Sequence, residues 1–73
     1  MTIDIHDTVQ DIVEYCPEAM EVLVNLGFDQ IANPLMLKTM GRFMTLPKAS
    51  KAKSVPLDTI ISAFSDRGIT VLL

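Results

Sequence analysis

The feature that most constrains this chain is a series of short apolar stripes at helical spacing, separated by proline and glycine. The first stripe consists of Val9, Ile12, Val13 and Cys16. Positions i, i+3, i+4 and i+7 share one face of a helix, so this spacing predicts an amphipathic helix. Thr8, with Asp11 three residues later, has the pattern of a capping box at its start.

Proline and glycine also mark the limits of two further helices. Pro17 cannot continue the first helix but suits the first position of a second, and Gly27 stands where a left-handed residue ends a helix. Asn33 and Pro34 are a cap and first-turn pair that opens a third helix, and Gly41 ends it. The residues between them, 28–32, are expected to form a connector.

The third helix is apolar nearly all round, with Leu35, Met36, Leu37 and Met40. Such a helix is usually buried, and here it could also carry a subunit contact. Met36, Met40 and Met44 recur at every fourth residue. This spacing favours gap-filling in the core or an adaptable contact surface over a haem or copper ligand series.

Two more helices are predicted in the last part of the chain. Thr45 and Pro47 open the fourth, and Pro56 precedes the fifth, which Gly68 ends. The fifth helix has the clearest stripe, formed by Leu57, Ile60, Ile61 and Phe64. Together these segments predict an all-α fold of about five short helices in a single domain, residues 1–73.

The two terminal segments have a different pattern. Residues 2–5 alternate polar and apolar side chains, and residues 69–73 are a second strand candidate. They could pair as one short two-stranded addition to the helices, because chain termini often lie close together.

The charges are unevenly distributed along the sequence. Residues 1–29 contain seven acids and no Lys or Arg, whereas residues 30–57 contain five bases and no acid. The bases are Lys38, Arg42, Lys48, Lys51 and Lys53. We expect this segment to contact an acidic partner or an anion, although a solvated basic face is the commoner explanation.

The composition narrows the class of protein. The chain has 73 residues, 49% of them hydrophobic, and one cysteine. A domain this small cannot hide so much apolar surface in its own core, and it has no disulfide to support it, so we expect a homodimer. No apolar run reaches the roughly 18 residues of a membrane span, and Asp4 and Asp7 stand where a secretory signal would carry bases. We therefore expect a soluble, cytoplasmic protein.

No pattern of residues predicts an enzyme, a cofactor or a metal site. His6 is the only histidine, and a zinc site needs three or four ligands. Cys16 belongs to the apolar stripe, where burial keeps a thiol inert. Asp11, Glu14, Glu18 and Glu21 follow helical spacing, which is typical of a solvated acidic face.

The segment from Thr45 to Phe64 resembles a helix-turn-helix, with Ser50, Ser54, Val55 and Ile60 near the characteristic positions. However, its second helix is poor in side chains that could donate to base edges, and the net charge of −3 opposes phosphate contacts. Nucleic-acid binding is therefore an alternative rather than the leading hypothesis.

The whole chain resembles a family of small bacterial and archaeal domains of unknown function, which includes redox-disulfide domains associated with hybrid-cluster proteins. The matching residues are Thr8-Val9, Tyr15 to Ala19, Val22-Leu23, Leu26 to Phe28, Asn33-Pro34, Thr45-Leu46, Ala49 and Leu57 to Phe64. The resemblance implies a small multihelical fold and an accessory role beside hemerythrin-like or sensory proteins.

In the redox-type members of that family, two cysteines would fall at Gln30 and Asn33. Neither is cysteine here, so disulfide exchange is not expected. The resemblance instead leaves a small-ligand pocket near Gln30 and Asn33 as a second alternative. Our leading hypothesis is a non-catalytic helical protein-interaction or accessory module.

Overall fold

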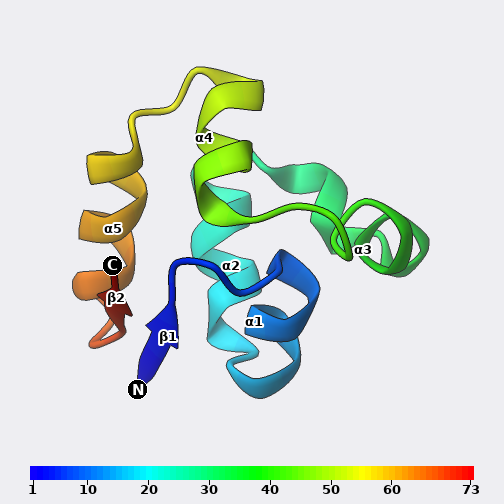
Figure 1. The fold of residues 1–73 in the computed structure, drawn as a ribbon. Helices are drawn as coiled ribbons and strands as arrows, with labels where there is room; N and C mark the ends of the chain where they lie inside the picture. Colours follow the sequence, from blue (N-terminus) through cyan, green and yellow to red (C-terminus); the bar gives the residue numbers. More distant parts are fainter.

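A computed structural model describes residues 1–73, and it joins the two ends of the chain in one small sheet. Strand β1 (Thr2–Asp4) pairs in parallel with β2 (Thr70–Leu72), in the register Ile3 opposite Val71. Figure 1 shows the two strands side by side next to the last helix. The predicted terminal pairing is confirmed, and β2 has β1 as its only strand neighbour.

Five α-helices lie between the strands, which confirms the all-α fold class. They are α1 (Val9–Tyr15), α2 (Glu18–Asn25), α3 (Pro34–Thr39), α4 (Leu46–Lys53) and α5 (Leu57–Ser65). The predicted caps form at three of them: the side chains of Thr8, Asn33 and Thr45 accept hydrogen bonds from backbone amides in the first turns of α1, α3 and α4. Local sequence therefore sets where these helices begin.

Two of the helices end next to a residue with a positive φ, which is a glycine after α2 and a serine after α4. Gly27, at φ +104°, follows α2 and has the positive φ that the sequence predicts for this position. Ser54 ends α4 in the left-handed region at φ 54°, which is uncommon for a residue with a side chain. The connector at residues 28–32 contains a short 3-10 helix, η1 (Asp29–Ala32), for which the sequence shows no pattern.

The core is entirely apolar and is shared by four helices and both strands. It consists of Ile3, Ile5, Val9, Ile12, Val13, Cys16, Ala19, Val22, Leu23, Phe28, Leu46, Ala49, Ile60, Phe64, Ile69 and Val71. Burial of the first stripe is complete, since all four of its residues belong to this cluster. Cys16 is 3% exposed, as predicted for a core residue.

Helix α3 lies at the edge of this core, against which only its partly buried Leu37 packs. It has no buried residue, and Leu35 is 68% exposed. Figure 1 shows α3 at the side of the molecule opposite α5 and the strands. The expectation that this apolar helix is buried is therefore wrong. The helix is too short and too peripheral for its apolar surface to be covered on more than one side.

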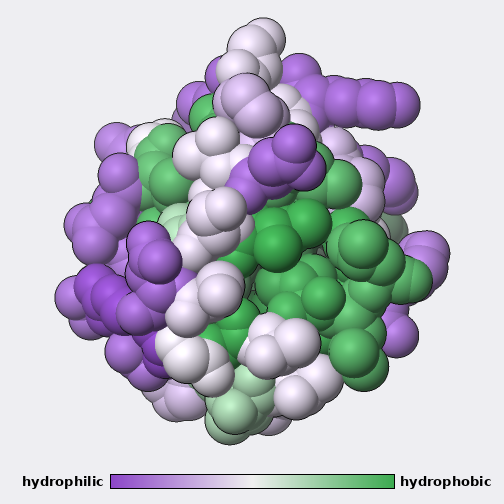
Figure 2. All heavy atoms as spheres, turned by 90° about the vertical axis from the view of Figure 1, so that its left-hand side faces the viewer, coloured by the Kyte–Doolittle hydropathy of each residue, from purple (hydrophilic) through white to green (hydrophobic).

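Hydrophobic side chains are also visible on the opposite side of the molecule. Figure 2 shows them gathered on the face that carries α5 and the terminal strands. In these terminal segments Met1 is 63% exposed and Leu72 is 54% exposed. None of the helices combines the length and the apolar composition that crossing a bilayer would require.

Candidate functional site

An apolar pocket lies between η1, α3 and α4. It has a cavity volume of about 80 Å³, and nine of its twelve lining residues are hydrophobic. The lining residues are Val9, Leu23, Phe28, Gln30, Ile31, Met36, Met40, Gly41, Met44, Ala49, Ala52 and Lys53. All three regularly spaced methionines thus meet at one site, although only Met36 lies within the limits of α3.

The loop between α3 and α4 is held in place by the start of α1. The amide of Val9 donates to the carbonyl of Met44 at 2.7 Å, and the amide of Gln10 donates to the carbonyl of Gly41 at 3.1 Å. Gly41 is required by a close approach, since a Cβ built there would lie 2.3 Å from the carbonyl oxygen of Leu37. The wall of the pocket is therefore fixed by backbone contacts.

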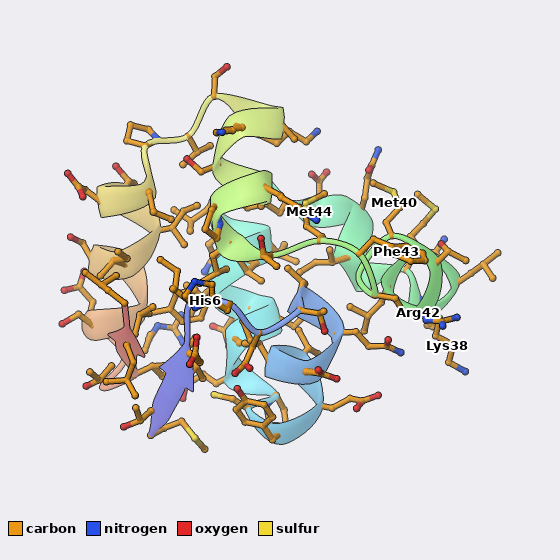
Figure 3. All side chains as sticks on the ribbon, in the orientation of Figure 1. His6, Lys38, Met40, Arg42, Phe43 and Met44 are labelled. Carbon is orange, nitrogen blue, oxygen red and sulfur yellow. The ribbon has the colours of Figure 1, made fainter.

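A second, shallower depression adjoins the pocket. It is lined by Thr39, Met40, Phe43, Met44, Lys48 and Ala52. Because Met40, Met44 and Ala52 line both hollows, the two form one continuous surface, which we call the methionine groove. Figure 3 shows Met40, Phe43 and Met44 on the side of α3 and its following loop that faces α4. Phe43 is 71% exposed and Met40 is 40% exposed.

The five predicted contact bases do not form a single cluster. Lys53 lines the pocket and Lys48 lines the adjoining depression. Lys38 and Lys51 are exposed but line neither hollow. The guanidinium of Arg42 lies 5.7 Å from the centre of the Phe43 ring, in a cation-π contact at the edge of the groove.

Gln30 and Asn33 have different positions. Gln30, in η1, lines the pocket. Asn33 does not line it, because its side-chain oxygen accepts a hydrogen bond of 2.9 Å from the amide of Leu35 and so caps α3. Of the two positions that the family resemblance singled out, one lies at the pocket and the other is structural.

A cluster of polar side chains outside the groove joins the turn after β1 to the end of α1. The backbone amide of His6 donates to Asp4 Oδ1 at 2.7 Å, and its Nδ1 lies 3.0 Å from the same oxygen. These contacts hold the pKa of Asp4 below its usual value. The hydroxyl of Tyr15 donates to Asp7, and partial burial together with this carboxylate raises the pKa of Tyr15 to about 12.

This cluster has no geometry for holding a metal. The His6 side chain is 82% exposed, as expected for a turn histidine. Nowhere in the structure do three or more His, Cys, Asp or Glu side chains come together as a possible ligand set.

The acidic face of α2 is partly neutralised by a distant base. Arg67 donates to Glu18 Oε1 at 3.2 Å and to Glu21 Oε1 at 2.9 Å. The two carboxylates hold the guanidinium and do not flank a cleft. Sequence reasoning missed this contact because Arg67 lies more than 40 residues away along the chain.

The segment that resembles a helix-turn-helix forms α4, a three-residue turn and α5. The hydroxyl of Ser50 donates to the carbonyl of Val55 and closes the turn. The exposed residues of α5 are Asp58, Thr59, Ser62 and Ser65. This face offers no Lys, Arg, Asn or Gln for reading base edges.

The methionine groove is therefore the site with the most developed geometry. Its wall consists of thioethers, aliphatic groups and two phenyl rings. Its polar groups are the amide of Gln30, the hydroxyl of Thr39 and the ammonium groups of Lys48 and Lys53. Methionine side chains are flexible and polarisable, so such a surface adapts to different apolar groups. This arrangement is suited to binding an apolar group that has negative charge beside it.

The fold is that of a small helical domain of a known family. The model of that family, described as a domain of unknown function (DUF1858), matches residues 3–61. The chain belongs to this family, which confirms the resemblance to a domain family of unknown function.

A solved structure is similar over nearly the whole chain. It is the crystal structure of a conserved domain protein from Streptococcus pneumoniae TIGR4, with 39% sequence identity and a TM-score of 0.92. The similarity covers 97% of this chain and 90% of that one. No protein with a curated description matches the chain.

Proposed function

We propose that this domain is a non-catalytic protein-interaction module that binds a larger partner through the methionine groove. The observation that carries the proposal is the meeting of Met36, Met40 and Met44 at a hollow whose rim is exposed and basic. Helix α3 has no buried residue, so packing within the monomer does not explain an apolar surface at this place. Contact with a partner, which would cover these side chains, does explain it.

The groove offers enough apolar surface to anchor a partner. Burying one large apolar side chain contributes roughly 1.5 to 3 kcal/mol. Met40 and Phe43 are both exposed in the free domain, and a bound partner would bury them. Interfaces are enriched in aromatic residues and methionine, and a few well-packed anchors usually provide most of the affinity.

Affinity capture from native cells tests this proposal. A tagged Met40→Ala/Phe43→Ala double variant should capture the partner at least about tenfold less than the wild type, because two central apolar contacts are lost. The control is Leu73→Ala, which removes an apolar side chain that is 83% exposed and lies outside the groove, and it should capture normally. Equal capture by the groove variant and the wild type would rule out this surface.

The family resemblance suggests the kind of partner and its location. A hemerythrin-like or sensory protein in the cytoplasm is the partner we propose. Mass spectrometry of the captured material, together with cell fractionation, tests both points. The proposal fails if the groove-dependent partners are of another class or if the domain is found outside the cytoplasm.

Self-association is a second proposed property. It is supported by the exposed apolar side chains on two separate sides of the molecule, which include Leu35 and Leu72. Sedimentation equilibrium should give a mass that approaches twice the chain mass of 8.1 kDa as the concentration rises. A mass that stays at 8.1 kDa at millimolar concentration would contradict it.

A further inference from the structure

We infer that the methionine groove binds an acidic amphipathic helix of the partner, with two apolar side chains inserted into the two hollows. This inference rests on the proposed function and specifies the chemistry of the bound segment. It follows from the shape of the groove, from its volume and from the charges beside it.

The shape favours a helix with paired anchors. The pocket and the adjoining depression share Met40, Met44 and Ala52, so two neighbouring side chains can enter them from one side. On a helix, residues three or four apart have Cβ atoms about 5 to 6 Å apart and lie on the same face. Helix-in-groove recognition uses anchors with this spacing.

The volume of the deeper hollow fits one side chain. A water-sized sphere needs about 10 to 15 Å³ of such space, so the cavity of about 80 Å³ has room for an aliphatic side chain such as leucine. The shallower hollow is bordered by the Phe43 ring, whose surface away from Arg42 is exposed and can pack on a second anchor. Both hollows together take two anchors of a helix and leave its other face in solvent.

The charges select an acidic segment. Lys53 stands at the pocket and Lys48 at the depression, while residues 30–57 contain no acid. Lys48 Nζ donates to the carbonyl of Phe43 at 3.3 Å, and an ammonium group has three donors, so it can also reach a carboxylate. A basic helix in the same position would be repelled, which is how charge sets the choice of partner.

A second copy of this chain does not present such a segment. The acidic helices α1 and α2 already bury their apolar faces in the core, and Glu18 and Glu21 are engaged by Arg67. The acidic helix must therefore come from a different protein.

Methyl NMR on the intact chain tests the inference. The chain has five methionines, Met1, Met20, Met36, Met40 and Met44, and each gives one methyl signal after labelling. The probe is a synthetic peptide of roughly 15 residues, which is long enough to form a helix. It has two leucines four residues apart as anchors, and glutamates at the positions of the helix that do not face the groove. We expect it to shift the signals of Met36, Met40 and Met44 and to leave those of Met1 and Met20 unchanged.

Two control peptides and two protein variants separate the contribution of charge to binding from that of the apolar anchors. Replacing the glutamates by lysines, or the leucines by alanines, should each weaken binding at least about tenfold. Lys48→Ala/Lys53→Ala should weaken binding of the acidic peptide by about the same factor. Lys38→Ala/Lys51→Ala changes the net charge equally but should bind like the wild type.

Several outcomes would overturn the inference. They are an acidic peptide that leaves the three groove signals unshifted, a basic peptide that binds equally well, and equal losses in the two lysine double variants. Decanoate serves as the probe for a small apolar acid, and a shift of the same signals by decanoate alone would replace the helix with a small ligand. If capture of the native partner still depends on Met40 and Phe43, these results overturn the acidic helix and leave the proposed function intact.

Discussion

Arg67 Nη2 donates to Glu21 Oε1 at 2.9 Å, and this contact ties the turn after α5 to the first turn of α2. The same guanidinium reaches Glu18, so one base holds two carboxylates at the start of a helix, where the helix dipole also favours negative charge. The hydrogen bond from Arg67 keeps the pKa of Glu21 below its usual value of 4.5 and raises the pKa of Arg67.

This ion pair should stabilise the fold in a pH-dependent way. Because the pKa of Glu21 is lowered in the folded state, its contribution is present above the usual value of 4.5 and is lost as the pH falls through the folded pKa. Arg67→Ala should therefore lower the thermal midpoint slightly at pH 7 and hardly at all near pH 2. Salt should reduce the difference, because both groups are partly exposed. A difference that is the same at both pH values would contradict the assignment.

Tyr15 should titrate well above a free tyrosine. It is the only tyrosine and there is no tryptophan, so tyrosinate absorbance reports this group alone. The midpoint should lie near 12 in the folded protein and near 10 in concentrated urea. Since the folded pKa is raised, the stabilisation is present below pH 10 and is lost as the pH rises from 10 to 12.

The Asp7→Asn variant serves as the control for this titration. It removes the carboxylate charge and keeps the shape of the side chain, so the Tyr15 midpoint should fall, while burial, the largest cause of the raised pKa, keeps it above 10. An unchanged midpoint would show that Asp7 is not responsible for the raised pKa.

Two adjacent residues of α5 offer a matched test of core packing. Ile60 is fully buried, whereas Ile61 is only partly buried. Ile60→Val should lower the free energy of unfolding by about 1 kcal/mol, because a buried methylene group is lost and a small cavity remains. Ile61→Val should cost less than half of that. Urea denaturation measures both, and equal losses would show that the packing of α5 is assigned to the wrong face.

Ser54 is a site where stability can be gained. Its left-handed φ of 54° is strained for a residue with a side chain and normal for glycine. Ser54→Gly should raise the free energy of unfolding by up to about 1 kcal/mol, part of which is offset by the greater freedom of glycine in the unfolded chain. Urea denaturation is again the measurement. A loss of stability would mean that the Ser54 side chain makes a contribution of its own.

The helices could be predicted because the signals that place them are local. Thr8, Asn33 and Thr45 cap helices within three residues of themselves, and Gly27 adopts its left-handed φ next to α2. The terminal strand pairing could be proposed from the alternation at residues 2–5 and from the tendency of chain termini to lie close together. Its parallel register could not be proposed, because it depends on the position and direction in which the chain leaves α5.

The groove could not be predicted from the sequence. The spacing of Met36, Met40 and Met44 favoured core gap-filling or an adaptable contact surface, but it did not show that the three meet, because α3 ends at Thr39. The three side chains converge because the loop at Gly41 is hydrogen-bonded to α1. Likewise, an apolar composition alone predicted burial of α3, whereas its position at the edge of the molecule leaves it exposed.

The parallel pairing of β1 with β2 has a consequence for biosynthesis. Ile3 is made before all five helices, whereas its partner Val71 is made after them. Closing so large a loop is slow compared with forming the local helices. During translation the helices can therefore form while β1 still lacks its partner, and the domain reaches its native state only once Leu72 has left the ribosome.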